Sequence, residues 1–211
     1  MDSKIKELKE QFPLIDCFSV VCDFSKLTTM AEYRALVTDS GIDKLDIGIL
    51  CLNAGLANMG PIDLVEDERY EAVWNVTGLH NVYLMKALAK QQMDRDKRSA
   101  VLFTSSIAAH MVFAGNASYS ATKAMVSNFG ESLYYELREN VDVTVWEPGM
   151  IESNFHLARP PSFLTKTNKS AVSDILTLLG KERKTMGSLF FSLSPLPPTW
   201  CHAPRDAKSM R

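Results

Sequence analysis

The feature that most limits the fold of this chain is the alternation of short apolar runs with long helical patterns. Apolar runs occupy residues 46–52, 99–104 and 141–146, and each ends at a polar or turn-forming residue. Helical patterns fill the two intervals, over residues 67–95 and 116–139. Strands that alternate with helices of this length predict βαβ units and a doubly wound parallel α/β sheet. Ligands of such sheets bind beyond the carboxyl ends of the strands.

The rest of the chain is predicted to belong to the same single domain, over residues 1–211. On the N-terminal side we expect a helix over residues 4–11, a strand over 15–22 and a helix near 27–39. On the C-terminal side we expect a helix near 169–180, a strand at 187–192 and an irregular tail over 192–211.

Composition argues against several classes of protein. A net charge of −2 offers no broad basic surface, so we expect a small-molecule partner and no nucleic acid. No run reaches the roughly 18 apolar residues that cross a bilayer, and the first residues lack a signal-peptide pattern, so we expect no transmembrane segment and a cytoplasmic protein.

The cysteines form no CxxC pair, which predicts buried free thiols; they are Cys17, Cys22, Cys51 and Cys201. The histidines lack metal-ligand spacing, so no metal is expected; they are His80, His110, His156 and His202.

The stretch Tyr119-Ser-Ala-Thr-Lys123 places a phenol and an ammonium four residues apart in an Ala-rich helical pattern. This spacing puts both groups on one face of a helix, so both can point into one cleft. A nearby cation would lower the pKa of Tyr119 from about 10 toward working pH, which makes a usable general acid or base. Ser106 follows a predicted strand, where its hydroxyl could bind a substrate oxygen. Each feature alone also fits an ordinary role, as a core-edge tyrosine, a solvated lysine or a capping serine.

In their order along the chain, these motifs resemble the short-chain dehydrogenase/reductase superfamily, whose pattern is Ser, then Tyr-x-x-x-Lys, then Pro-Gly. Ser106 in Thr104-Ser-Ser-Ile-Ala-Ala109, the pair Tyr119 and Lys123, and Pro148-Gly149 match this pattern. Two further motifs match: Asn53-Ala54-Gly55 is similar to most of the family's Asn-Asn-Ala-Gly turn, and Asn75 in Trp74-Asn-Val-Thr-Gly78 to its catalytic asparagine. The resemblance implies a Rossmann-type fold.

Three shorter and less specific motifs resemble one branch of that superfamily, which contains hydroxysteroid dehydrogenases and very-long-chain 3-oxoacyl-CoA reductases. These motifs are Cys22-Asp23-Phe24, Leu45-Asp-Ile-Gly-Ile-Leu50 and Thr185-Met-Gly-Ser-Leu-Phe-Phe191.

The resemblance implies a role for each matching residue. Tyr119 would pass a proton to or from the substrate oxygen, Ser106 would orient that oxygen, and Lys123 would bind the nicotinamide ribose and lower the pKa of the tyrosine. Asn75 would hold a water of the proton relay, although an Asn in a helix is otherwise more often a kink or a cap.

The remaining matches would contact the cofactor. Asp23 would lie at the adenine, and the turn Asn53, Ala54 and Gly55 would run along the cofactor. Pro148 and Gly149 would lie at the nicotinamide, and Ile151 near the carboxamide. Residues 150–168 would form a loop over the substrate.

The chain departs from the family pattern ahead of Asn53. A complete member has a turn of the form Thr-Gly-x-x-x-Gly-x-Gly there, whereas the glycines before Asn53 are Gly41 and Gly48. We therefore expect an N-terminally truncated Rossmann-type domain that lacks the first βαβ unit. Its sheet would have a gap with unpaired edges.

The favoured function is an oxidoreductase that transfers a hydride between NAD(P)(H) and a carbonyl or secondary alcohol of a steroid-like or fatty-acyl 3-oxo substrate. The branch resemblance implies NADP, with NAD as the other choice. A homo-oligomer is a possible assembly. The expected location is the cytoplasm, or the cytosolic face of the endoplasmic reticulum if the full-length form has the N-terminal anchor common in this branch. Two other functions stay open: a catalytically inactive remnant that binds another protein, and a hydrolase that uses Ser106 and Lys123. The hydrolase would leave Asn53-Ala54-Gly55 and Pro148-Gly149 unexplained.

Overall fold

The computed structural model describes residues 2–152 and 166–187. Most of the expected substrate loop (150–168), nearly all of the expected strand at 187–192 and the tail over 192–211 lie outside the described residues. Within them, no helix is both long and apolar enough to cross a bilayer.

The described strands form a parallel sheet in the order β1-β2-β3-β4. They are β1 (Ile49–Leu52), β2 (Ser99–Thr104), β3 (Val141–Trp146) and β4 (Lys184–Thr185). The bounds of β2 and β3 are those predicted from the sequence, and β1 is shorter than its predicted run. Because the strands are parallel, the carboxyl ends of β1, β2 and β3 lie at one edge of the sheet.

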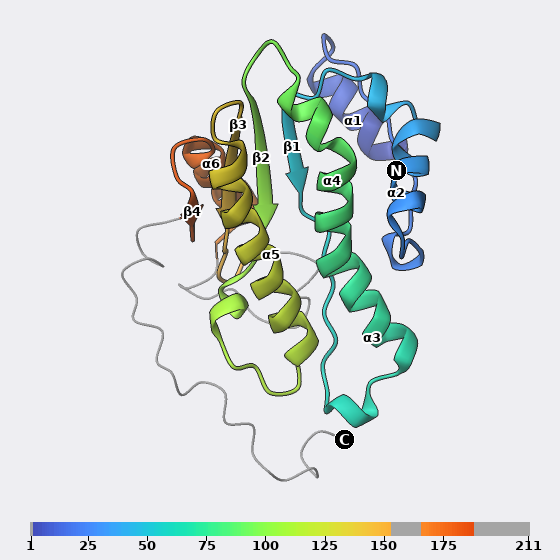
Figure 1. The fold of residues 1–211 in the computed structure, drawn as a ribbon, viewed down its shortest axis with the longest axis vertical. Coiled ribbons are helices and arrows are strands. Elements are labelled where there is room, and N and C mark those ends of the chain that lie inside the picture. The colour runs from blue at the N-terminus through green and yellow to red at the C-terminus, as the bar shows by residue number, and fades with distance from the viewer. Residues whose placement is uncertain (1, 153–165, 188–211) are drawn as a thin grey trace.

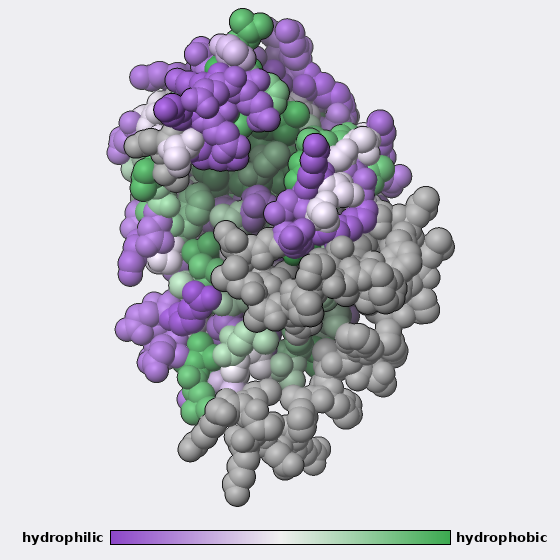
Figure 2. Space-filling model, turned by 180° about the vertical axis from the view of Figure 1, so that it is seen from behind, coloured by the Kyte–Doolittle hydropathy of each residue, from purple (hydrophilic) through white to green (hydrophobic). Residues whose placement is uncertain are grey.

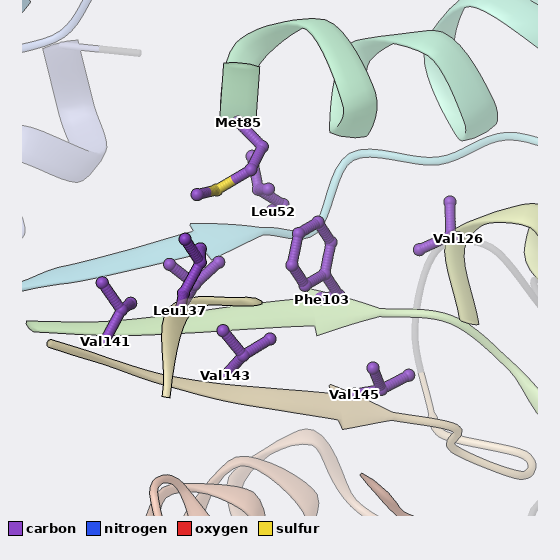
Figure 3. Close-up of a cluster of buried hydrophobic side chains, with 9 residues drawn as sticks. Leu52, Met85, Phe103, Val126, Leu137, Val141, Val143 and Val145 are labelled. Atoms are coloured by element: carbon purple, nitrogen blue, oxygen red, sulfur yellow. The ribbon is translucent and has the colours of Figure 1, made fainter. Parts of the chain in front are cut away.

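Two long helices cover one face of this sheet (Figure 1). They are α4 (His80–Met93) and α5 (Ala117–Leu137). Met85 of α4 and Val126 of α5 belong to the same buried cluster as Phe103 and the valines of β3 (Figure 3). This cluster anchors α5, and with it the Tyr119 segment, on the strands that lead to the other candidate residues.

The opposite face is covered by α6 (Asn168–Leu178), where Ile175 packs with Leu102 and Trp146. Helices on both faces confirm the predicted doubly wound arrangement. The remaining described helical elements precede β1 or lie between β1 and α5 along the chain. They are α1 (Asp2–Gln11), η1 (Phe24–Lys26), α2 (Met30–Asp39), η2 (Ile42–Lys44), η3 (Ile62–Leu64), α3 (Asp67–Val73), η4 (Trp74–Leu79) and η5 (Ile107–His110).

The long helical pattern predicted over residues 67–95 is divided into three parts. The α-helices α3 and α4 are joined by η4, which is a π-helix. A π-helical turn inserts an extra residue into the helical repeat and is frequent at functional sites. Apolar periodicity predicts the helix but not this turn. The turn packs closely against α5, since a Cβ added at Gly78 would meet Met125 Cε at 2.6 Å and Thr122 Cγ2 at 3.2 Å.

The strand predicted over residues 15–22 is wrong, because this segment has no regular secondary structure. A strand requires the backbone groups of a neighbouring strand, and in the described part of the chain β1 pairs with β2 alone. The apolar residues that suggested the strand are largely exposed, with Phe18 at 60% and Val21 at 83%.

The prediction of buried thiols is also wrong for Cys51, which is free but exposed. Cys51 lies on β1, where Leu52 is buried and Ile49 is 56% exposed. Alternate residues of a strand face opposite sides of a sheet, and here α4 and α5 cover one side of this strand. Cys17 and Cys22 are free and partly buried.

Candidate active site

Ser106 lies directly beyond the carboxyl end of β2. Its side chain caps η5 by accepting a hydrogen bond from the backbone N–H of Ala108 at 3.2 Å. The backbone on either side of Ser106 continues the pairing with β3: Ser105 N donates to Trp146 O at 2.7 Å, and Ile107 N donates to Pro148 O at 3.1 Å. The serine is therefore held at a defined place beside the end of β3.

Tyr119 and Lys123 lie one turn apart near the start of α5, as predicted. Lys123 is only 3% exposed, and its Nζ donates to the carbonyl oxygen of Thr104 at 2.7 Å. The same ammonium lies over the ring of Tyr119, 5.7 Å from the centroid. The Ser105 hydroxyl donates to the Lys123 carbonyl at 2.7 Å and ties this turn of α5 to the end of β2.

The electrostatics of the pair differ from the expectation. Burial raises the pKa of Tyr119 above its usual value of 10.0, and a hydrogen bond with Ser106 lowers it by less. Burial also lowers the pKa of Lys123 to about 8. The expected lowering of the tyrosine pKa by Lys123 is thus not found, because desolvation of both groups outweighs it and the ammonium faces the ring. The structure does bring Ser106, Tyr119 and Lys123 into one site.

The turn Asn53-Ala54-Gly55 follows β1 and reaches the same site. A Cβ added at Gly55 would lie 3.4 Å from Lys123 Nζ, so glycine keeps space open beside the ammonium. Thr77 of the π-helix secures the next residue, because its Oγ1 accepts from Leu56 N at 2.9 Å and donates to Leu56 O at 2.6 Å. Sequence reasoning missed Thr77, although it stands two residues after Asn75 in a motif already singled out.

Asn75 is buried within the π-helix and faces η1. Its side-chain amide donates to Ser25 O at 3.1 Å. Asp23 caps the same short helix by accepting from Ser25 N at 2.9 Å. Hydrogen bonds from the Ser25 side chain and then from its backbone lower the pKa of Asp23. Asp23 and Asn75 are therefore joined through Ser25. Their roles at the adenine and in a proton relay stay predictions.

Pro148, Gly149 and Ile151 follow β3, at the edge of the sheet where Ser106 lies. Pro148 contributes its carbonyl to the pairing beside Ser106, and Ile151 forms a bridge with Lys166 and packs against the cluster under α6. Their predicted contacts with a nicotinamide stay predictions. The described residues contain no group of three His, Cys, Asp or Glu side chains arranged for a metal ion.

Two described histidines have specific packing roles that the sequence did not reveal. His80 is 1% exposed and stacks on Phe24 with ring centroids 4.9 Å apart; burial lowers its pKa to about 4. His110 is paired with the buried carboxylate of Glu147. His156 and His202 lie outside the described residues.

Comparison with known proteins identifies the family. The family model described as short chain dehydrogenase matches residues 1–160. The chain belongs to the short-chain dehydrogenase family. The Ser-Tyr-Lys arrangement seen here lies within the matched residues.

Relatives of this short-chain dehydrogenase carry several different names. The very-long-chain 3-oxoacyl-CoA reductase of Mycosarcoma maydis is 26% identical over 190 residues, which cover 89% of this chain and 53% of that protein. An uncharacterized oxidoreductase of Myxococcus xanthus is 32% identical over 158 residues, 72% of this chain and 58% of that protein. The serine 3-dehydrogenase of Agrobacterium fabrum is 38% identical over 120 residues, 54% of this chain and 46% of that protein. The chain thus spans about half the length of the curated relatives that it matches.

Among solved structures, a 7β-hydroxysteroid dehydrogenase superposes with a TM-score of 0.75 and 23% identity. The match covers 90% of this chain and 74% of that chain, and it confirms the short-chain dehydrogenase fold.

The residues of this short-chain dehydrogenase fit one half of a nicotinamide dinucleotide. An ammonium can donate three hydrogen bonds, and Lys123 uses one on Thr104 O beside the space kept open by Gly55, which suits a ribose diol. The pyrophosphate half fits less well. Among the described residues before β1, Gly41 and Gly48 are the glycines, and neither stands in a Gly-rich turn at the start of an α-helix.

Proposed function

We propose that this protein is an oxidoreductase that transfers a hydride between a nicotinamide cofactor and a carbonyl or secondary alcohol. In this proposal Tyr119 is the acid or base, Ser106 orients the substrate oxygen, and Lys123 binds the nicotinamide ribose. The observation that carries the proposal is the burial of Lys123 over the Tyr119 ring, with Ser106 bonded to the same tyrosine. A lysine ammonium is rarely buried in this way, because the aliphatic part of the side chain normally lets the charge reach water.

The proposed chemistry follows from the protonation states of these groups. Because burial keeps the pKa of Tyr119 above 10.0, its hydroxyl carries a proton at neutral pH and can give it to a carbonyl oxygen during reduction. A bound nicotinamide would supply the hydride. Ser106 would donate to the same oxygen and stabilise the charge that develops there. Lys123 would hold its bond to Thr104 O and turn its other protons toward the ribose.

For the substrate we propose an apolar ketone or a 3-oxoacyl thioester, and for the cofactor NADP(H). The match to a very-long-chain 3-oxoacyl-CoA reductase over 89% of this chain supports this class. The branch motifs around Asp23 and Thr185 support the same choice.

The proposal is tested by NADPH binding and oxidation in the 211-residue chain. We expect weak binding by calorimetry, on the order of −5 kcal/mol, because the chain has the residues proposed to contact the ribose and the nicotinamide but no Gly-rich turn for the pyrophosphate. At millimolar NADPH and with an apolar ketone, oxidation should be slow but measurable. Tyr119→Phe should lower that rate by about 10²- to 10⁴-fold, since it removes the acid, and should leave the affinity for NADPH unchanged.

The matched control is Tyr135→Phe, which removes a hydroxyl from an exposed tyrosine of the same helix. This variant should oxidise NADPH at the wild-type rate. Equal rates in the Tyr119 and Tyr135 variants would remove Tyr119 from the reaction, and a wild-type chain that neither binds nor oxidises millimolar NADPH would contradict the proposed function.

A further inference from the structure

Glu147 is a buried carboxylate that none of the proposed catalytic steps uses. It follows β3 directly and is 2% exposed. Each of its oxygens has a partner: Oε1 accepts from the hydroxyl of Ser127 at 2.5 Å, and Oε2 lies 2.9 Å from Nε2 of His110. Both the neutral ring protonated at Nε2 and the imidazolium can donate to that oxygen.

The two partners of Glu147 belong to the two segments that carry the proposed catalytic groups. Ser127 lies four residues after Lys123 on α5, so it shares a helix face with Lys123 and Tyr119. His110 is the last residue of η5, the short helix that Ser106 caps. One carboxylate therefore links the tyrosine segment to the serine segment.

The backbone places Glu147 beside Ser106. The residues before and after it, Trp146 and Pro148, accept hydrogen bonds from the residues before and after Ser106. Glu147 itself donates its backbone N–H to Thr185 O of β4 at 2.8 Å. The carboxylate is thus anchored in the sheet, and its side chain reaches outward to η5 and α5.

The chemistry of the link indicates a purpose other than packing. An unpaired buried carboxylate is strongly unfavourable, and even a paired one is often no better for stability than an apolar residue of similar size. What it does provide is two short, directional, charge-assisted hydrogen bonds. Such bonds restrict the separation of the two elements that they join.

We propose that Glu147 is a positioning residue that holds Ser106 at hydrogen-bonding distance from Tyr119 by linking η5 to α5. The catalytic meaning of this inference rests on the proposed function. The physical claim, that Glu147 controls the hydrogen bond between Ser106 and Tyr119, does not depend on it and can be tested in the chain alone.

The test uses Glu147→Gln, which keeps the shape of the side chain but removes its charge, so that neither hydrogen bond to Ser127 or His110 is charge-assisted and the link is weakened. The readout is the ¹³Cζ resonance of Tyr119 at pH 7 in tyrosine-labelled protein, assigned with Tyr119→Phe. This resonance reports the hydrogen bond of the phenol. In Glu147→Gln it should move toward the position found in Ser106→Ala, where the hydrogen bond is absent.

The matched control is Glu131→Gln, which removes a carboxylate of α5, the helix that carries Tyr119 and Ser127. Glu131 is partly buried and pairs with Arg183 and Lys184, beyond the segment that carries Tyr119. The control should lose some stability and keep the Tyr119 resonance at the wild-type position. A resonance that stays unchanged in both Glu147→Gln and Glu131→Gln would overturn the proposal.

A second pair of variants covers the case in which Glu147→Gln does not fold. His110 is about half exposed, so its replacement is compatible with folding. His110→Gln keeps a donor near the position of Nε2 and should keep the wild-type resonance, whereas His110→Ala should shift it toward Ser106→Ala. Identical behaviour of the two His110 variants would contradict the link. Because this readout needs neither cofactor nor turnover, its failure is distinct from a failure to oxidise NADPH.

Discussion

At the scale of the residue, Lys123 is an ammonium held in surroundings that favour the neutral amine. The residue is buried, and its charge is met by Thr104 O at the end of β2 and by the ring of Tyr119. Burial lowers the pKa of Lys123 from 10.5 to about 8, so the chain gives up stability at neutral pH to keep a charge in the site. Such a compromise is expected of a functional group and not of a packing residue.

Replacing Lys123 by methionine should therefore stabilise the chain at neutral pH. Between pH 8 and 10.5 the unfolded chain holds a proton that the folded chain has lost, so wild-type stability rises with pH through this window, while below pH 8 the full penalty applies. The penalty is at most about 3 kcal/mol, and loss of the bond to Thr104 O removes about 1 kcal/mol, which leaves a gain of about 2 kcal/mol at pH 7.

Urea unfolding of Lys123→Met and wild type at several pH values checks this prediction. The difference in the free energy of unfolding should be largest at pH 7 and should shrink as the pH approaches 10.5. A difference that is independent of pH would show that the ammonium is not desolvated in the folded chain.

At the scale of the element, the position of α5 decides whether the site forms. The helix lies close to the sheet at Gly130, where an added Cβ would meet Val145 Cγ2 at 2.6 Å and Phe103 Cδ2 at 3.1 Å. Both side chains belong to the buried cluster shown in Figure 3, so neither can move aside easily. A displacement of α5 there would be transmitted along the helix to Lys123 and Tyr119.

Gly130→Ala should destabilise the chain in spite of the higher helix propensity of alanine. Propensity favours alanine by about 1 kcal/mol, whereas overpacking of a core costs about 1 to 3 kcal/mol, so a net loss of up to about 2 kcal/mol is expected. Asn128→Ala is the control, because Asn128 is exposed on the same helix and gains propensity without meeting the sheet. Urea midpoints should fall for Gly130→Ala and stay or rise for Asn128→Ala; a stabilised Gly130→Ala would refute the close contact.

At the scale of the whole molecule, the main irregularity is the side of the sheet bounded by β1. Within the described residues β1 pairs with β2 alone, and Ile49 and Cys51 on it are exposed. The preceding segment adds exposed Phe18 and Val21. Figure 2 shows hydrophobic surface within a hollow between two hydrophilic regions of the molecule. Exposed strand edges and large apolar patches favour association with another chain.

We therefore expect the 211-residue chain to self-associate as its concentration rises, and Ile49→Lys to reduce the association by placing a charge on the edge strand. Leu176→Lys is the control, since Leu176 is a similarly exposed apolar residue on α6 at 52%. Light scattering after gel filtration over a range of concentrations should give a lower mean mass for Ile49→Lys than for wild type or the control. Equal masses for the two lysine variants would mean that the edge of β1 is not the contact.

The patterns of the sequence were sufficient for features that depend on neighbouring residues. The bounds of β2 and β3, the helix α5 and the shared face of Tyr119 and Lys123 all follow from apolar periodicity and from a spacing of four. Those patterns also placed Ser106 and the turn Asn53-Ala54-Gly55 at strand ends, where the structure finds Ser106 bonded to Tyr119 and Gly55 beside Lys123.

Only the tertiary structure decided the features that depend on residues distant in the sequence. Residues 15–22 have the pattern of a strand but form none, because a strand is completed by a neighbour and not by its own sequence. The raised pKa of Tyr119 and the lowered pKa of Lys123 come from the packing of α5 on β2, which excludes water from both groups. The link from Glu147 to Ser127 and His110 joins three segments, and only the fold brings a carboxylate, a hydroxyl and an imidazole from those segments within hydrogen-bonding distance.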